Sequence, residues 1–312
     1  MTALAWFLPS ACSQAAEADR FLPGDTEIIV HVNLRQALDS DLVKKYALEQ
    51  IKTQLKQSAE LQAVLTAAGV DPIKDITSLT LAAPGKISAD SGLVIVRGNF
   101  DADKFHKAAA DFADKNPESL KIHKSDHGPL YEGKDKNKGK PVFATLLSQG
   151  TLVFSPSRKL VLDAVARNGD KKPAPLNKKL QTLVGAMDGK QGIWIAALPS
   201  KELKAELAKN PQGKNIANKL QTLSGGITIA QDAKAEIRIQ TSDAKAALEI
   251  RRLLEVGKAL LIFRVADNEV YGPLLADIVS GIKIRTDKGA VNIEAVVTAA
   301  QIEQGLKSKP KP

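Results

Sequence analysis

One short segment, His123-Lys124-Ser125-Asp126-His127, has the residue types and spacing that most resemble a metal site. Two imidazoles and a carboxylate suit zinc if further ligands come from elsewhere in the chain. On an extended strand, the four-residue spacing would place both histidine rings on one face. Asp126, His127 and Gly128, however, have the composition of a turn that breaks such a strand. We therefore keep a metal-assisted hydrolase using His123 and His127 as an alternative hypothesis and expect no cofactor.

The sequence offers no set of residues for nucleophilic catalysis, which needs a nucleophile, a base and an orienting group. Its single cysteine, Cys12, lies in an atypical N-terminal segment, and no serine stands in a Gly-x-Ser-x-Gly motif. His31 and His106 fall within an expected strand and an expected helix, where structural roles are the rule. The glycines at 225–226 precede an expected strand, so they do not form a phosphate-binding loop at a helix N-terminus. We predict no catalytic residues and a protein that is not an enzyme.

Positive charge is concentrated in the second half of the chain. Residues 19–167 contain 21 Lys and Arg against 19 Asp and Glu, a net of +2, and residues 168–312 contain 23 against 15, a net of +8. A polar loop at 133–140 adds four lysines, Lys134, Lys136, Lys138 and Lys140. We expect this loop at a solvated hairpin tip. An alternative function is binding of a polyanion or an anionic surface through the basic second half and these lysines.

Aromatic residues make up 4% of the 312 residues, against 44% apolar residues overall. Carbohydrate platforms and grooves for single-stranded nucleic acid depend on stacking rings, so this composition argues against both. The sequence also lacks zinc-finger and helix-turn-helix signatures. Nucleic acid is therefore not an expected partner.

The first 18 residues differ from the rest of the chain and are predicted to be a signal peptide or leader. Residues 2–9 form an apolar run, and Ala16-Glu17-Ala18 fits the pattern before a signal-peptidase cut. Cleavage after Ala18 would send the protein to the periplasm or the medium. In one alternative, residues 8–12 act as a lipobox and Cys12 is lipidated, the one route by which we expect a membrane contact. In another, the segment is a cytosolic tail.

The strands and helices that would position these residues occur in the same order twice along the chain. Turn residues between consecutive strands indicate mainly antiparallel pairing. Further helices are expected over 42–55, 61–68 and 201–209, the last capped by Ser200. The matched elements, first repeat before second, are 27–32 with 192–196, 78–82 with 226–230, 93–96 with 237–239, a helix capped by Asp101 with a helix capped by Asp243, and 142–166 with 282–306.

The predicted fold is α+β, with two tandem repeats that each form a mainly antiparallel sheet backed by helices. A polar, proline-containing stretch marks the linker between the repeats. The predicted organisation is a leader at 1–18, a first repeat at 19–167, a linker at 168–175, a second repeat at 176–306 and a disordered basic tail at 307–312.

Three segments, residues 21–27, 32–38 and 92–98, resemble uncharacterised secreted proteins of planctomycete-type bacteria. They also resemble, more loosely, a wider bacterial family of unknown function with a repeated α+β domain behind a signal or anchor. The likeness is clearest over residues 21–165. It implies export and the two-repeat fold, and it brings no activity and no site residues.

These observations lead to a functional prediction by exclusion. We expect a non-enzymatic extracytoplasmic protein that acts as a binding or envelope structural module. Its expected partner is an unidentified protein or another envelope component, and its specific role lies outside what the residues indicate.

Overall fold

The structure is a computed structural model. It describes residues 19–57, 62, 65–66, 69–85, 91–125, 128–134, 139–148, 150–169, 175–209 and 211–308. The leader, with Cys12 and Ala18, lies outside these residues, as do His127, Lys136 and Lys138.

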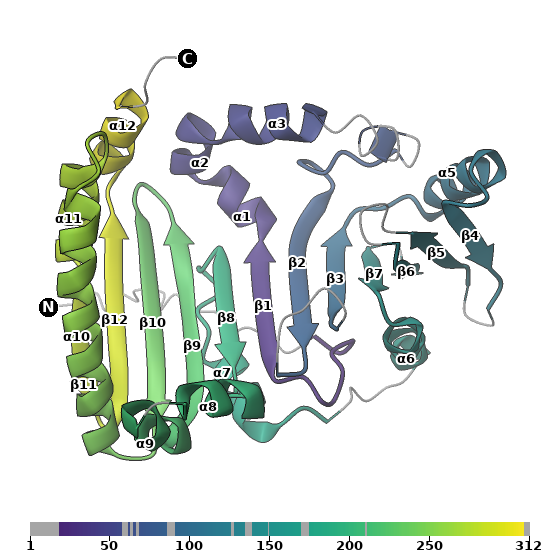
Figure 1. Ribbon diagram of the computed structural model, residues 1–312. Coiled ribbons are helices and arrows are strands. Elements are labelled where there is room, and N and C mark those ends of the chain that lie inside the picture. Colours follow the sequence, from purple (N-terminus) through teal and green to yellow (C-terminus); the bar gives the residue numbers. More distant parts are fainter. Residues whose placement is uncertain are drawn as a thin grey trace, which may run out of the picture.

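One sheet of twelve strands runs through the molecule in the order β11-β12-β10-β9-β8-β1-β2-β3-β7-β6-β5-β4 (Figure 1). Every pairing in it is antiparallel. The α+β class and the antiparallel sheet predicted from the sequence are therefore confirmed. The strands are β1 (Ile28–Asn33), β2 (Ile76–Ala83), β3 (Leu93–Gly98), β4 (Leu120–His123), β5 (Leu130–Lys134), β6 (Pro141–Ser148), β7 (Thr151–Ser155), β8 (Ile193–Ala197), β9 (Leu220–Ile229), β10 (Ala233–Thr241), β11 (Lys283–Asp287) and β12 (Ala290–Val297).

Helices flank both faces and both ends of this sheet. In Figure 1, α10 and α11 lie at the edge of the sheet formed by β11 and β12, whereas α1 to α3 extend across its upper side. The helices in the described part of the chain are α1 (Leu34–Asp39), α2 (Asp41–Tyr46), α3 (Leu48–Gln57), α5 (Ala102–Lys115), α6 (Arg158–Gly169), α7 (Lys178–Gly185), α8 (Lys201–Leu207), α9 (Pro211–Lys219), α10 (Ala244–Ala266), α11 (Gly272–Ser280) and α12 (Ala299–Lys307).

The two halves of the chain share this sheet instead of forming one sheet each. β1 pairs with β8, so that Val30 lies opposite Ile195. Without this pairing, both strands would be edges with unpaired backbone groups. Outward from the junction, the order is β1-β2-β3-β7-β6 on one side and β8-β9-β10-β12-β11 on the other. Both halves thus connect their strands in the same order, while the division into two repeats and the linker at 168–175 remain predictions.

Local sequence patterns predicted most of the helices and strands but not all of their first and last residues. Asp101, Asp243 and Ser200 cap α5, α10 and α8 as expected, each accepting a hydrogen bond from a backbone N–H in the first turn. The single helix expected over 42–55 is instead two helices, α2 and α3, that meet at Ala47. Helix α9 was not predicted, because its polar sequence shows little apolar periodicity. The helix expected at 61–68 lies largely outside the described residues.

Side chains on opposite faces of the sheet pack into two separate cores. Since ladder partners share a face and successive residues alternate, the register assigns each side chain to a face. On the first face, helices α6 and α7 cover the central strands through a core that includes Ile29, Trp194 and Leu180. On the second face, α9 and α10 cover the β9–β12 end through a smaller core that includes Ile250 and Val291.

Replacement of Leu180 tests the first core. Leu180 is fully buried on α7. We expect Leu180→Ala to lower the free energy of unfolding by about 2–5 kcal/mol, because it deletes apolar contacts and leaves a cavity. Urea unfolding measures the change. Gln181→Ala, one position along on the exposed side of α7, is the matched control and should change it by less than about 0.5 kcal/mol. Equal effects of the two variants would show that α7 does not close the core.

Candidate functional site

One contact in the structure concerns the proposed metal ligand His123. His123 ends β4, and its Nε2 atom lies 2.7 Å from Oε2 of Glu132 on β5. His127, the second expected ligand, lies outside the described residues. Within the described ranges, no group of three or more His, Cys, Asp or Glu side chains could hold a metal ion. His123 therefore forms a two-residue contact with a carboxylate at the outer strands of the sheet.

The lysine loop is described only at its two ends. Lys134 is the last residue of β5 and is exposed, and Lys140 comes directly before β6. The two strands pair with each other, so these lysines flank a hairpin as expected. β5 and β6 lie near the opposite end of the sheet from β11, so the sheet separates these two lysines from the strands of the basic second half.

His31 and His106 are held by neighbouring side chains in structural contacts. His31 stacks on Trp194 with ring centroids 5.1 Å apart, and its Nδ1 atom lies 2.9 Å from the hydroxyl of Thr80. His106 Nδ1 lies 3.1 Å from the hydroxyl of Tyr131. Burial raises the pKa of Tyr131 to about 12, so this hydroxyl stays protonated at neutral pH. Each of the two histidines therefore has a neighbouring hydroxyl group as its hydrogen-bond partner.

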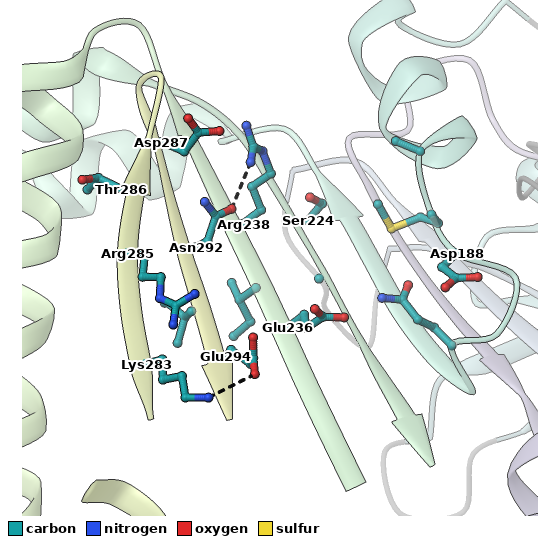
Figure 2. Close-up of a pocket in the computed structure, with 16 residues that line it drawn as sticks. Asp188, Ser224, Glu236, Arg238, Lys283, Arg285, Thr286, Asp287, Asn292 and Glu294 are labelled. Atoms are coloured by element: carbon teal, nitrogen blue, oxygen red, sulfur yellow. Dashed lines mark hydrogen bonds and ion pairs between the residues drawn. The ribbon is translucent and has the colours of Figure 1, made fainter. Parts of the chain in front are cut away.

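A polar cleft of about 540 Å³ lies on the first face of the sheet, at the β9–β12 end (Figure 2). Its floor comes from neighbouring strands, because the register places Ser224, Arg238 and Asn292 side by side. Asp188, in the segment between α7 and β8, stands at the opposite wall in Figure 2. The cleft therefore lies where the first face continues beyond the cover of α7.

Charges within the polar cleft largely compensate one another. Arg238 donates a hydrogen bond of 3.0 Å to Oδ1 of Asn292, and Lys283 lies 3.8 Å from Glu294 (Figure 2). The cations of the lining are Arg238, Lys283 and Arg285, and the carboxylates are Asp188, Glu236, Asp287 and Glu294. Because these carboxylates outnumber the cations, the cleft has no excess of positive charge for a polyanion.

An apolar groove of about 440 Å³ lies on the second face, bounded by α8, α9 and α10. Leu203 of α8 and Leu253 of α10 stand at its rim with exposed fractions of 46% and 45%. Ser200 is buried beside it, but its hydroxyl already accepts the N–H of Leu203 as the helix cap. The lining residues are Ile28, Gly85, Ile195, Ala197, Leu198, Pro199, Ser200, Leu203, Leu207, Ile216, Leu220, Thr222, Leu223, Ile239, Ile250, Leu253 and Leu254.

The floor of the groove continues along the central strands. Register places Ile195 beside Val30, Val30 beside Leu81, and Leu81 beside Val94 in one apolar row across β8, β1, β2 and β3. All four side chains are half-buried, in contrast to the buried residues of the first face. The apolar surface is thus continuous from the groove across the β1–β8 junction.

Two carboxylates stand at one end of the groove, around Gly85. A methyl group placed on Gly85 would lie 2.8 Å from Oε2 of Glu27 and 3.3 Å from Oε2 of Glu202. The residue also has a φ of +58°, a backbone conformation suited to glycine. Apolar lining and negative charge therefore meet at this end of the groove.

Sequence reasoning missed this groove. Its lining comes from β1, β8, α8, α9, β9, β10 and α10, and each apolar residue taken alone has the pattern of an ordinary core position. The one signal available was the high aliphatic and low aromatic content, which matches the lining but does not locate it.

Comparisons with known proteins do not assign a family. No family model matches this chain, and no curated protein matches it. A solved structure entitled "Structure of crystal form I of TP0453" matches at 10% sequence identity and a TM-score of 0.47, covering 95% of this chain and 98% of that chain. We base no functional argument on this match.

The pH dependence of stability tests the environment of His31. Burial lowers the pKa of His31, an effect that Asp19 opposes and Arg97 assists. The unfolded chain therefore binds this proton more readily, and stability is lost as the pH falls through the ordinary histidine value of about 6.5. We expect urea unfolding from about pH 7.5 to about pH 5.5 to show a smaller loss of stability in His31→Gln than in the wild type. Equal losses of stability in the variant and the wild type would show that His31 is solvated and not buried.

Proposed function

We propose that this protein is a non-enzymatic binding protein whose apolar groove holds the aliphatic chain of an amphiphilic ligand. The observation that carries the proposal is the groove itself: about 440 Å³, almost wholly apolar in its lining, and open to solvent between α8 and α10. Its volume falls within the roughly 300–1,000 Å³ typical of ligand pockets.

The exposed rim supports a ligand as the occupant. Apolar surface left in water costs about 25 cal/mol for each Å², so a folded chain gains by covering it. Leu203 and Leu253 both line the groove, and nearly half of each side chain remains exposed. A ligand chain inserted between them would remove both side chains from water.

The chemistry of the lining favours an aliphatic chain over a ring system. Among the described residues that line the groove, none is aromatic. Aromatic ligands gain from stacking on protein rings, which this lining does not offer. Branched aliphatic side chains instead provide dispersion contacts with little directionality, and a flexible chain satisfies these in many conformations.

Glu27 and Glu202 favour a polar end that is cationic or donates hydrogen bonds. Their carboxylates meet at Gly85, so an anionic headgroup there would face two like charges. Like charges at close range are unfavourable even near the protein surface. A fatty acid is therefore a poorer fit than a neutral or amine-bearing amphiphile of the same chain length.

The residue types of the same lining support a proposal of binding without turnover. Ser200 and Thr222 supply its hydroxyl groups, and none of the described lining residues is a His, Cys, Asp, Glu or Lys. The proposed place of action is outside the cytoplasm, on the basis of the leader predicted at 1–18. The envelope is also where amphiphilic ligands are abundant.

The alternatives drawn from the sequence have less support. A polyanion site in the second half would be expected at the polar cleft, where carboxylates accompany the cations. A hydrolase using His123 would need ligands beyond Glu132. The groove is the better-supported site.

A competition experiment tests the proposal. We expect a long-chain alkylamine to bind more tightly than the matching alcohol, and the alcohol more tightly than the matching carboxylate, each measured by isothermal titration below its critical micelle concentration. Leu203→Asp should weaken all three by about tenfold, because it places a charge in the apolar rim. Leu306→Asp on α12, where the leucine is 37% exposed, is the matched control. Equal affinities of wild type and Leu203→Asp would contradict the proposal.

Replacement of the Glu202 carboxylate tests how the ligand's headgroup contributes to binding, separately from its aliphatic chain. Glu202 is exposed on α8, so Glu202→Gln should leave the fold intact. We expect this variant to narrow the preference for the amine over the carboxylate by about threefold to tenfold, with little change for the alcohol. An unchanged preference would show that the polar end of the ligand lies elsewhere.

A further inference from the structure

The largest concentration of exposed apolar side chains lies on α10. Leu253, Val256, Leu260 and Phe263, here called the α10 stripe, are 45%, 59%, 67% and 82% exposed. Their spacing of three, four and three residues places them along one side of the helix. Isolated exposed apolar residues are ordinary, but a continuous stripe of this kind marks an interaction surface.

The stripe faces away from the contacts that hold α10 on the sheet. Ala246, Ala247 and Ile250 are buried in the first half of the helix and pack towards the second core. In the second half, Lys258 donates hydrogen bonds from Nζ to the backbone oxygens of Ser280, the last residue of α11, and Ile282, which precedes β11. The helix is therefore fixed to the domain while the stripe stays in solvent.

Positive charge accompanies the stripe. Within α10, the cations are Lys245, Arg251, Arg252, Lys258 and Arg264, against the carboxylates Glu249 and Glu255. Arg252 and Arg264 lie next to the first and last residues of the stripe and are exposed. Neither arginine has an ion pair or side-chain hydrogen bond within the described part of the chain. An apolar stripe with free cations at both ends suits a surface that is apolar inside and anionic outside.

We infer that the α10 stripe is a contact site for an anionic lipid bilayer. Its leucines and Phe263 enter the boundary between headgroups and acyl chains, while Arg252 and Arg264 remain at the level of the lipid phosphates. None of the described helices is long and apolar enough to cross a membrane, and contact through one face of α10 requires no crossing. This route differs from lipidation of Cys12, the one membrane contact expected from the sequence.

The flanking arginines disfavour a second copy of this chain as the occupant. In an antiparallel pairing of two α10 stripes centred on Lys258, Arg252 of one copy faces Arg264 of the other. In a parallel pairing, each arginine faces its own counterpart. Both arrangements bring like charges together at the ends of an apolar seam, which destabilises helix pairs. Anionic headgroups compensate the same charges.

The α10 stripe adjoins the apolar groove, but the proposed bilayer contact is separate from the proposed ligand binding. Leu253 belongs to both, whereas Val256, Leu260 and Phe263 do not line the groove. A bilayer held against the stripe would therefore lie next to the groove rim. Bilayer contact does not require an occupied groove, so the two proposals can fail separately.

Vesicle co-sedimentation tests the inference. The full chain is mixed with vesicles of phosphatidylcholine alone or with added phosphatidylglycerol. We expect binding to the anionic vesicles that weakens as salt is raised, since the charge term is screened. The double variant Leu260→Asp with Phe263→Asp should lose more than about tenfold in binding, because its apolar contact becomes anionic. Arg252→Gln and Arg264→Gln should each lower the affinity for the anionic vesicles by about fivefold and leave binding to phosphatidylcholine vesicles unchanged.

Leu203→Asp serves as the matched control on the neighbouring helix. It should lose amphiphile binding and keep vesicle binding, whereas the double variant in the stripe should do the reverse. Circular dichroism and the melting temperature check that each variant is folded. Equal vesicle binding by wild type and the double variant would overturn the inference. So would a dimer in sedimentation equilibrium that the double variant abolishes, because it would identify a second copy as the occupant.

Discussion

The antiparallel pairing of β1 with β8 is the constraint on which the rest of the structure depends. It joins two sheets that would otherwise end in open edges, and it makes one continuous sheet of strands from both halves of the chain. Its register also decides the faces: a shift by one residue would exchange the side chains of Ile29 and Val30 between them. With the observed register, Ile29 enters the first core, and Val30 joins the apolar floor of the second face.

The two faces of the sheet expose different surfaces because the helices cover them unequally. On the first face, α6 and α7 close over the central strands, and the exposed remainder beyond α7 is polar. On the second face, α8, α9 and α10 gather at the β9–β12 end and leave the central strands half-covered. The apolar groove lies where that cover ends. Local hydrogen bonds then hold α10 in place, through the Asp243 cap at its start and Lys258 near its middle.

The sequence predicted many elements but did not indicate the apolar groove. Caps at Asp101, Ser200 and Asp243 were recognisable because a side chain next to the helix start satisfies free N–H groups locally. His123 and His127 stood out because metal ligands have a familiar spacing, yet the described contact of His123 is with Glu132. The groove had no comparable signal, because its residues are ordinary aliphatic side chains drawn from seven separate elements. The start of α10 was predicted from its Asp243 cap, but its exposed stripe was not, since a helix apolar on many sides is more typical of a buried one.

By itself, the sequence determined the α+β class, the antiparallel hairpins and the capped helices. All of these depend on residues close together in the chain: turns, alternation and capping side chains. Tertiary structure alone decided that β1 and β8 join the halves, that the second face stays open, and that the stripe from Leu253 to Phe263 faces solvent. These outcomes depend on which distant surfaces pack together. Burial of an apolar side chain is therefore a property of the assembled fold, and the residue type does not settle it.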